Sequence, residues 1–245
     1  MPSPCPGMPA SIRPGDPEQV RDLFEQIAPA YDRLNDLLSL GLHRLWKRQA
    51  VAWLQPRPGQ RLLDLCCGTG DLALLLAAKL RPGGLVLGLD AAAAPVQQAR
   101  RRAALQPWLP VEFRVGDALA TGLADGWADG AVMAYGLRNL ADPGAGLREL
   151  RRLLQPGARA AVLDFNRSPD AEGLTARFQR LYLRQLVVPL ARQAGLESQY
   201  AYLEESLLRF PTGEQQQQLA LEAGFSGADH RLLAAGQMGL LQLVA

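Results

Sequence analysis

The sequence predicts an α/β fold, in which a mostly parallel sheet carries helices on both faces and ends in an antiparallel hairpin. Three observations predict it. Short apolar runs alternate with amphipathic stretches over residues 61–165, which is typical of parallel strands joined by helices. A turn containing two glycines follows the first run, within the stretch Arg61–Asp71. The chain closes with two strand-like runs, Phe225–Leu233 and Met238–Val244, whose short connection predicts an antiparallel edge.

Composition bounds the class of protein. The 245 residues suffice for one α/β domain, and 48% hydrophobic with 20% charged residues is ordinary for an enzyme outside the membrane. A net charge of +2 is too small to indicate a nucleic-acid partner. Three cysteines, two of them adjacent, suggest neither a disulfide framework nor a metal site. There is no signal peptide or apolar run of membrane-spanning length, so we expect a cytoplasmic protein that could touch a membrane surface.

The N-terminal part predicts a helical cover. Residues 1–15 are rich in proline and small side chains, and we expect a disordered tail there. Asp16-Pro17-Glu18 is a helix start, with a capping acid followed by proline in the first turn. The helices of residues 16–55 could lie over the ligand crevice of a single domain that spans residues 16–245.

The cofactor-binding core is expected over residues 61–165. Its first strand begins the stretch Arg61–Asp71 and is followed by a helix that begins near Leu72. Further strands are predicted over Leu85–Asp90, Val111–Val115, part of Trp127–Tyr135, and Ala158–Phe165. Helices are predicted over Pro95–Leu105 and Ala145–Leu154, and Gln155-Pro156-Gly157 is predicted to be a turn.

After residue 165 the alternation stops. Residues 166–212 look helical and carry several aromatic side chains, so we expect a helical insertion of two or three helices divided at Pro189 and Gly195. Residues 213–245 supply a further helix, Glu214–Glu222, and the final hairpin.

The turn at Asp64–Asp71 is the first candidate ligand site. Gly68 and Gly70 permit a sharp turn and a close approach of the backbone to a ligand. A dinucleotide would put pyrophosphate at the following helix N-terminus, where further negative charge is unfavourable. The carboxylates of Asp64 and Asp71 instead suit S-adenosylmethionine, which carries an ammonium and a sulfonium and no phosphate, although Asp71 could merely cap the helix. Asp90 lies at the spacing of a ribose-binding acid, which serves either cofactor.

Several stretches together resemble the quinone C-methyltransferase family of ubiquinone and menaquinone biosynthesis, whose fold is that of class I methyltransferases. They are residues 31–36 (Tyr-Asp-Arg-Leu-Asn-Asp), 42–48 (Leu-His-Arg-Leu-Trp-Lys-Arg), 64–71 and 136–139 (Gly-Leu-Arg-Asn). Residues 187–189, 200–203 and 209–213 are most similar to the photosynthetic branch, which methylates 2-phytyl-1,4-naphthoquinone in phylloquinone synthesis. Ala91–Val96 departs from the family pattern after Asp90, which weakens the expectation of adenine contacts from that helix.

The resemblance implies cofactor contacts at five residues: Thr69, Asp90, Asp117, Ala118 and Tyr135. The chemistry agrees, because Asp90 can accept from both ribose hydroxyls and Asp117 from the adenine amino group. These residues follow strands, and open α/β sheets bind ligands at the carboxyl ends of their strands. Asp117 could also be a turn-forming residue.

The acceptor implied by the resemblance is an isoprenoid-tailed naphthoquinol. Only the reduced quinol, after loss of a phenolic proton, has a nucleophilic ring carbon. Arg138 and Asn139 could stabilise the phenolate or orient a water that takes the proton. Tyr31 and His43 are further candidates for a base or a hydrogen-bond partner, although His43 could equally be a structural helix residue. Aromatic residues of 178–202 could line a tail channel and reach a membrane surface, or could be ordinary core.

Other functions remain open at this stage. The acceptor could be demethylmenaquinol or a benzoquinol, because the fold does not separate these. A non-catalytic S-adenosylmethionine-binding protein is a further alternative, opposed by the pair Arg138 and Asn139. A dehydrogenase is disfavoured by the acidic turn, and the oligomeric state, a homodimer included, is left open.

Overall fold

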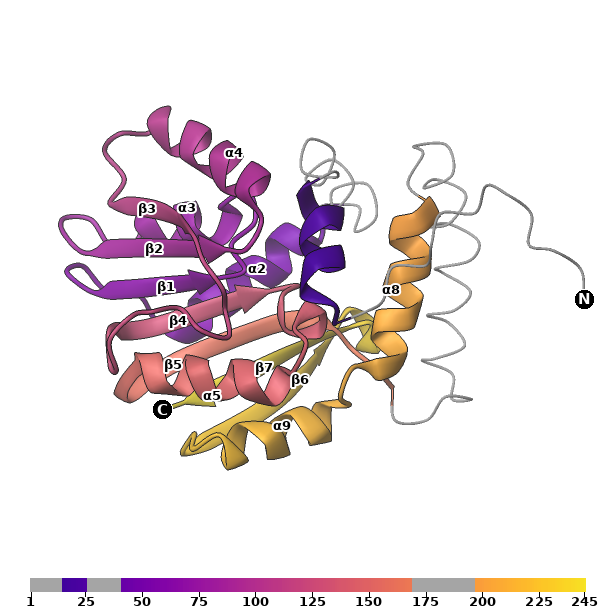
Figure 1. Ribbon diagram of the computed structural model, residues 1–245. Coiled ribbons are helices and arrows are strands. Elements are labelled where there is room, and N and C mark those ends of the chain that lie inside the picture. The colour runs from indigo at the N-terminus through magenta and orange to yellow at the C-terminus, as the bar shows by residue number, and fades with distance from the viewer. Residues whose placement is uncertain (1–14, 26–40, 169–196) are drawn as a thin grey trace, which may run out of the picture.

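The computed structural model describes residues 15–25, 41–168 and 197–245 of the chain (Figure 1). Seven strands form one sheet in the order β3-β2-β1-β4-β5-β7-β6. The strands are β1 (Arg61–Leu65), β2 (Leu85–Asp90), β3 (Val111–Val115), β4 (Ala128–Ala134), β5 (Leu154–Phe165), β6 (Gly227–Leu233) and β7 (Met238–Val244). The first five strands are parallel, whereas β7 pairs antiparallel with β5 and β6. The predicted parallel sheet and its final hairpin are therefore confirmed.

Helices cover both faces of the sheet because strand residues alternate in direction. Leu62 of β1 packs with one helical layer and Leu63 with the other. The layer around Leu62 contains α2 (His43–Leu54), α3 (Asp71–Ala77) and α4 (Ala93–Ala104). The opposite layer contains α5 (Pro143–Leu153) and α9 (Gly213–Glu222), which Figure 1 shows side by side. Two hydrophobic cores result, one on each side of the sheet.

Two helices begin two residues earlier than predicted, at positions where side chains cap them. Helix α5 begins at Pro143, where Asp142 accepts a hydrogen bond from the Ala145 N–H at 3.0 Å. Helix α4 begins at Ala93, and its cap comes from far along the chain: the Glu25 carboxylate accepts from the N–H groups of Ala93 and Ala94. Local sequence could not reveal this second cap.

The predicted turn at Gln155-Pro156-Gly157 is wrong. Strand β5 begins at Leu154 and these residues lie within it. The pairing with β4 shifts there, since Leu154 is opposite Ala128 while Arg159 is opposite Gly130. Gly157 has φ +77° and donates to the Ala245 carbonyl at 2.8 Å, so the segment is an irregular strand start that binds the end of the chain.

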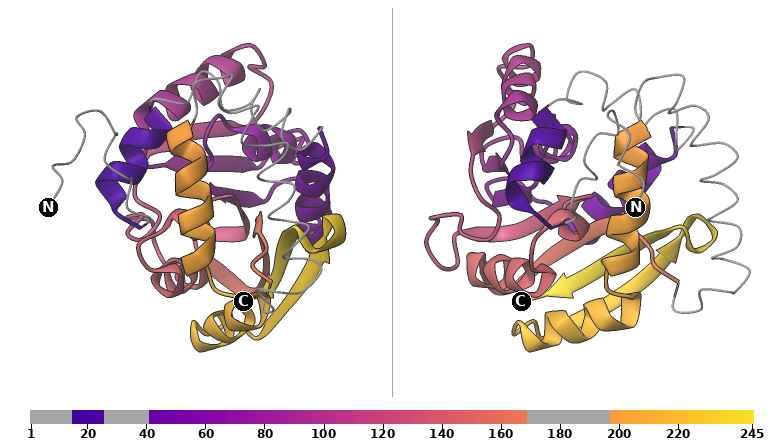
Figure 2. Two further views of the ribbon diagram at one scale, coloured as in Figure 1. Left: turned by 90° about the vertical axis from the view of Figure 1, so that its right-hand side faces the viewer. Right: turned by 45° about the vertical axis from the view of Figure 1, so that its right-hand side comes forward.

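The N-terminal helix and the insertion meet beside the sheet. Residues 17–25 are helical, and the Asp16 carboxylate accepts from the N–H groups of Glu18 and Gln19, as the helix-start signal predicted. Figure 2 shows this helix alongside α8 (Glu197–Arg209) in both views, and Leu23 packs against Tyr202 between them. The predicted disordered tail, the stretch 31–36 and most of the insertion lie outside the described residues.

The crevice for a ligand lies where the sheet order reverses. Strand β1 has β2 on one side and β4 on the other, so the connections that follow β1 and β4 leave toward opposite faces. Such a switch point opens a crevice at the carboxyl ends of the strands.

Candidate functional site

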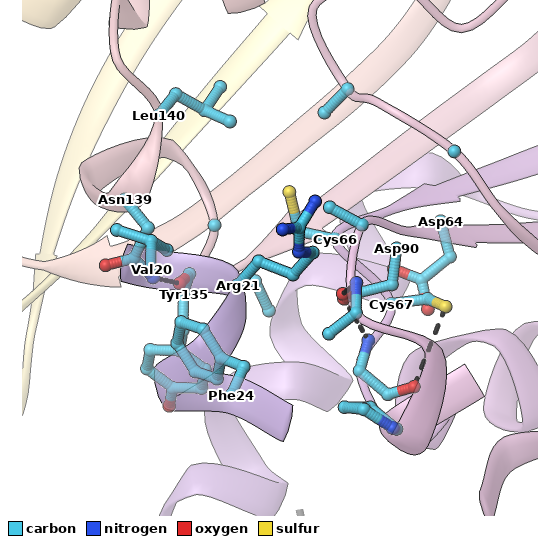
Figure 3. Close-up of a pocket in the computed structure, with 18 of the residues that line it drawn as sticks. Val20, Arg21, Phe24, Asp64, Cys66, Cys67, Asp90, Tyr135, Asn139 and Leu140 are labelled. Atoms are coloured by element: carbon cyan, nitrogen blue, oxygen red, sulfur yellow. Dashed lines mark hydrogen bonds between the residues drawn. The ribbon is translucent and has the colours of Figure 1, made fainter. Parts of the chain in front are cut away.

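A cavity of about 380 Å³ occupies this crevice, a volume in the range of small-molecule sites. Its lining comes from the carboxyl ends of β1, β2, β3 and β4 and the residues that follow them, from the helix of residues 17–25, and from Lys47 of α2. Figure 3 shows Val20 and Phe24 of that helix together with Cys66, Asp90 and Tyr135 from the strand ends. The N-terminal helix therefore forms a wall of the cavity.

The two glycines of the first turn have different structural roles. Both have positive φ, +52° at Gly68 and +84° at Gly70. A Cβ at Gly68 would meet no atom within 4 Å, and Gly68 lines the cavity. A Cβ at Gly70 would lie 2.6 Å from Cζ of Phe113, and Gly70 is not in the lining. Gly68 thus leaves space for a ligand, whereas Gly70 lets β3 pack against the turn.

Asp64 is a buried carboxyl group at the base of the cavity. It accepts a hydrogen bond from the Ala73 N–H of α3 at 2.9 Å. Burial raises its pKa to about 8, although the Ala73 bond and the charge of Lys47 oppose that rise. Asp64 can therefore bind a cationic ligand group with release of a proton.

Asp71 forms ion pairs with two cationic side chains of the protein. Its Oδ2 accepts from Lys47 Nζ at 2.8 Å and its Oδ1 from Arg102 Nη1 at 2.6 Å. Burial alone would raise the pKa of Asp71, but these two charges outweigh it and lower the pKa to about 2. Asp71 was predicted to offer negative charge to the cofactor, and in the structure that charge is compensated by Lys47 and Arg102.

Asp90 closes the turn from the end of β2. Its Oδ2 accepts from the Gly68 N–H at 2.8 Å and its Oδ1 from the Ala92 N–H at 3.0 Å. Burial raises its pKa, against these two bonds. Each carboxylate oxygen has a further lone pair, and Asp90 lines the cavity, so it can accept from a pair of vicinal hydroxyls.

Asp117, which follows β3, has both of the roles that the sequence suggested: it lines the cavity and it forms a turn. Asp117 lines the cavity and is exposed, while Oδ1 accepts from the Leu119 N–H at 2.8 Å and forms a turn. Ala118 and Thr69 are buried and also line the cavity. The remaining predicted cofactor residue, Tyr135, follows β4 in the lining with φ +60°, an uncommon value for a side chain of its size.

Asn139, in the turn after β4, lines the cavity. Its Nδ2 donates to the Tyr135 carbonyl at 2.7 Å, and its Oδ1 accepts from the Tyr202 hydroxyl at 2.7 Å. An amide nitrogen has two N–H donors, so one can serve a ligand. These contacts fix the rotamer of Asn139 and orient its amide.

Arg138 points away from the cavity. Its side chain is 6% exposed and lies 3.4 Å from Asp164, measured from Nε to Oδ1. Its backbone N–H donates to the same carboxylate at 3.1 Å, and its guanidinium donates to Ser206 of α8. Arg138 is not among the lining residues. In the described structure it stabilises the turn through Asp164, away from the cavity.

The other two predicted catalytic residues do not lie in the described lining. Tyr31 falls outside the described residues, and His43 is buried at the start of α2 without lining the cavity. Sequence reasoning missed Lys47 and Phe24, which do line it. The signal for Lys47 was available, because lysine occurs only twice in the chain and one copy lies in the stretch 42–48.

The fold and the acidic crevice define a class I methyltransferase. Residues 14–241 match the ubiE/COQ5 methyltransferase family, and the chain belongs to this family. It is 49% identical to a 2-phytyl-1,4-naphtoquinone methyltransferase of Synechococcus elongatus, over 94% of this chain and 98% of that protein. It is 43% identical to the Arabidopsis thaliana protein named 2-phytyl-1,4-beta-naphthoquinone methyltransferase, chloroplastic, over 90% and 85% of the two chains.

Solved structures agree on the fold. Phosphoethanolamine N-methyltransferase 2 of Haemonchus contortus, in complex with S-adenosyl-L-methionine, has a TM-score of 0.68 at 14% identity. The match covers 92% of this chain and 59% of that one. The predicted family, fold, enzyme class and cofactor are therefore confirmed. None of the helices in the described parts of the chain has the length and apolar character that crossing a bilayer requires.

Proposed function

We propose that this chain methylates a ring carbon of a prenylated naphthoquinol, 2-phytyl-1,4-naphthoquinol, with S-adenosylmethionine as the methyl donor. One observation carries the choice of acceptor. The relatives that bear the name of this activity match at 43–49% identity over 90% or more of the chain. The cavity supports the reaction class, because it joins a carboxylate-rich half to an amide on the turn after β4.

The half of the cavity beside β2 and β3 is proposed to bind the nucleoside. Asp90 accepts from the two ribose hydroxyls, held in place by the N–H groups of Gly68 and Ala92. The open space at Gly68 fits a ligand lying against the turn. Asp117 and Ala118 line the cavity at the end where the adenine lies. When bound, S-adenosylmethionine supplies an electrophilic methyl group on its sulfonium.

The half beside β4 is proposed to bind the acceptor. The second N–H of Asn139 Nδ2 donates to the oxygen next to the acceptor carbon, which stabilises negative charge there. Arg138, paired with Asp164, holds the turn so that this amide keeps its direction. A guanidinium has donors and no acceptor, so Arg138 is not the base. Tyr31 remains our candidate for a hydrogen-bond partner of the acceptor.

Methyl transfer to a panel of acceptors tests the function. The panel contains 2-phytyl-1,4-naphthoquinol, demethylmenaquinol and a demethylated benzoquinol, each reduced and each rigorously oxidised, with labelled S-adenosylmethionine. We expect transfer to the reduced phytylated acceptor above the other two, at a ring carbon identified by product mass and position. Preference for another quinol would contradict the proposed acceptor, and equal turnover of oxidised quinone would contradict the quinol mechanism.

Peripheral membrane contact through the insertion is part of the proposal. The acceptor carries a long apolar tail, and Leu208 of α8 exposes 73% of its surface. Deleting the whole insertion would remove Phe210, which is buried in the core, so Leu208→Glu is the cleaner variant. Its co-sedimentation with liposomes should fall relative to the wild type. Unchanged binding would contradict a membrane role for this helix.

A further inference from the structure

The lining of the cavity holds charges of both signs. Its carboxylates are Asp64, Asp71, Asp90 and Asp117, and its described cations are Arg21 and Lys47. The methionine part of S-adenosylmethionine carries a carboxylate as well as an ammonium. A carboxylate is repelled by the acidic residues and needs a cation of the protein. Arg21 and Lys47 are therefore the two candidates for binding this carboxylate.

The order of the strands orients the ligand. Asp117 follows β3, Asp90 ends β2, and Tyr135 follows β4 on the far side of β1. If the nucleoside lies against Asp117 and Asp90, the methionine part extends past Gly68 toward Tyr135. The Lys47 ammonium lies 6.0 Å from the centre of the Tyr135 ring. It is therefore at the methionine end of the cavity.

Lys47 is held in place and mostly buried, whereas about half of the Arg21 side chain is exposed to solvent. The Lys47 side chain is 12% exposed, and its ammonium donates to Asp71 at 2.8 Å. The Arg21 side chain is 48% exposed, with Asp22 at 3.9 Å. A partly desolvated and fixed cation binds a carboxylate more strongly than a solvated one, because it is less screened and loses less freedom.

Lys47 is paired with Asp71, but the ion cluster that contains both residues has an excess of positive charge that a ligand can use. Arg102 contacts the other oxygen of Asp71 at 2.6 Å, so two cations share one carboxylate. Arg102 also donates to the carbonyl and hydroxyl of Thr69, and it is not in the lining. The three groups carry a net charge of +1, and Lys47 is the cation of the three that lines the cavity.

We propose that the Lys47 ammonium binds the α-carboxylate of the methionine moiety of S-adenosylmethionine, with Asp71 and Arg102 holding it in position. The proposal rests on the cofactor site described under the proposed function. An ammonium has three donors, and one goes to Asp71, which leaves donors for the ligand. Helix α2 thereby becomes part of the cofactor site in addition to its packing on the sheet.

Calorimetric binding of two ligands tests the proposal without measuring turnover. The ligands are S-adenosylmethionine and its decarboxylated form, which keeps the sulfonium and the amine but lacks the carboxylate. Lys47→Met, which removes the charge and keeps the length, should raise the Kd for S-adenosylmethionine about 10- to 100-fold, as expected for a charge-assisted contact. The Kd for the decarboxylated ligand should change by less than about threefold. Equal losses for both ligands, or no loss for either, would overturn the proposal.

Three variants separate the alternatives. Lys47→Arg should restore most of the difference between the two ligands, because it restores the charge. Arg102→Met removes the other cation on Asp71 and should shift both ligands alike. A carboxylate-specific loss in Arg21→Met, with none in Lys47→Met, would assign the contact to Arg21 and overturn the proposal. If wild-type protein with an intact fold binds neither ligand, the proposed cofactor site itself fails, which is a distinct result.

Discussion

The hydroxyl of Tyr202 donates a 2.7 Å hydrogen bond to Oδ1 of Asn139, and so ties helix α8 to the turn after β4. The two residues are 63 positions apart, and both are buried or nearly so. Burial raises the pKa of Tyr202 to about 12, which keeps the hydroxyl protonated as a donor. Because the oxygen of the Asn139 amide is held, its nitrogen must face the Tyr135 carbonyl and the cavity. The insertion therefore helps to define the acceptor half of the site.

Tyr202→Phe should slow methyl transfer more than it weakens cofactor binding. The ring still packs against Leu23, but the Asn139 amide loses the bond that fixes its direction. A buried hydrogen bond of this kind contributes about 1 kcal/mol, so we expect kcat to fall about 5- to 10-fold. The Kd for S-adenosylhomocysteine should change by less than about twofold on the same reasoning. Steady-state kinetics and calorimetry measure the two quantities.

The matched control for Tyr202→Phe is Leu208→Ala on the same helix, because Leu208 is 73% exposed. With the acceptor presented in detergent micelles, this control should keep wild-type kcat. A Tyr202→Phe enzyme that keeps full kcat would show that the amide is held without α8. A fall in kcat matched by an equal loss of ligand affinity would indicate general damage to the site.

The Glu25 carboxylate joins the N-terminal helix to α4, and Glu25→Ala should loosen both. Glu25 accepts from the Ala94 N–H at 2.9 Å and from the Ala93 N–H, while Ala92 at the N-cap offers no side-chain cap. Loss of a helix cap costs about 1 kcal/mol. We expect faster amide hydrogen exchange at residues 18–25 and at Ala93 and Ala94. The Kd for S-adenosylhomocysteine should rise about 3- to 10-fold, as that cost implies, because Phe24 of this helix lines the cavity.

Glu18→Ala is the comparison for Glu25→Ala, since Glu18 is an exposed acid on the same helix. It should leave hydrogen exchange at Ala93 and Ala94 unchanged. Identical exchange in Glu25→Ala and wild type would mean that the contact with α4 contributes nothing to docking the helix.

Gly68→Ala and Gly70→Ala should separate ligand binding from folding. Both residues have positive φ, which costs an alanine about 1–2 kcal/mol. At Gly70 the new Cβ also meets Phe113 at 2.6 Å, so Gly70→Ala should lose about 2–4 kcal/mol of unfolding free energy in urea. Gly68→Ala should lose only the backbone cost and should bind S-adenosylhomocysteine more weakly. Equal stability of the two variants would contradict this division of roles.

Much of the fold was predictable because local chemistry determines it. The strand β2 has the bounds that its apolar run predicts, and β3 and β7 do as well. The helix start at Asp16 carries its own cap signal, and the structure follows it. The irregular start of β5 was not predictable, because Gly157 looks like a turn residue until the carboxyl end of the chain pairs with it.

The site was predictable where its residues follow strands and not where they depend on distant partners. Asp90 follows a strand in sequence, so its place at the crevice could be inferred, and the structure has it in the lining. Arg138 and Asn139 are neighbours with the same sequence signal. Only their partners, Asp164 and Tyr202, make one side chain turn inward and the other line the cavity. Such contacts over 26 and 63 positions leave no local pattern.

The stability of the ligand-free protein should fall with rising pH because of Asp64. Burial raises the pKa of this carboxyl from 3.8 to about 8. A group whose pKa is raised by folding contributes its full stability below its unfolded pKa and loses it as pH rises through the folded value. Between those values the loss is about 1.4 kcal/mol per pH unit. From pH 6 to pH 8, the wild type should therefore lose about 2 kcal/mol from this group.

Asp64→Asn isolates that contribution, because an amide does not titrate but can still accept from the Ala73 N–H. The charged groups that face Asp64 are Lys47 of α2, Asp71 of α3 and Asp90 of β2, and all three remain in the variant. Urea unfolding of both proteins at pH 6, 7 and 8 should therefore give curves that converge or cross, with the variant gaining on the wild type as pH rises. Parallel curves would mean that Asp64 is already ionised at pH 6. In that case the Lys47 ammonium would outweigh the burial of the carboxylate, and ligand binding would release no proton from this site.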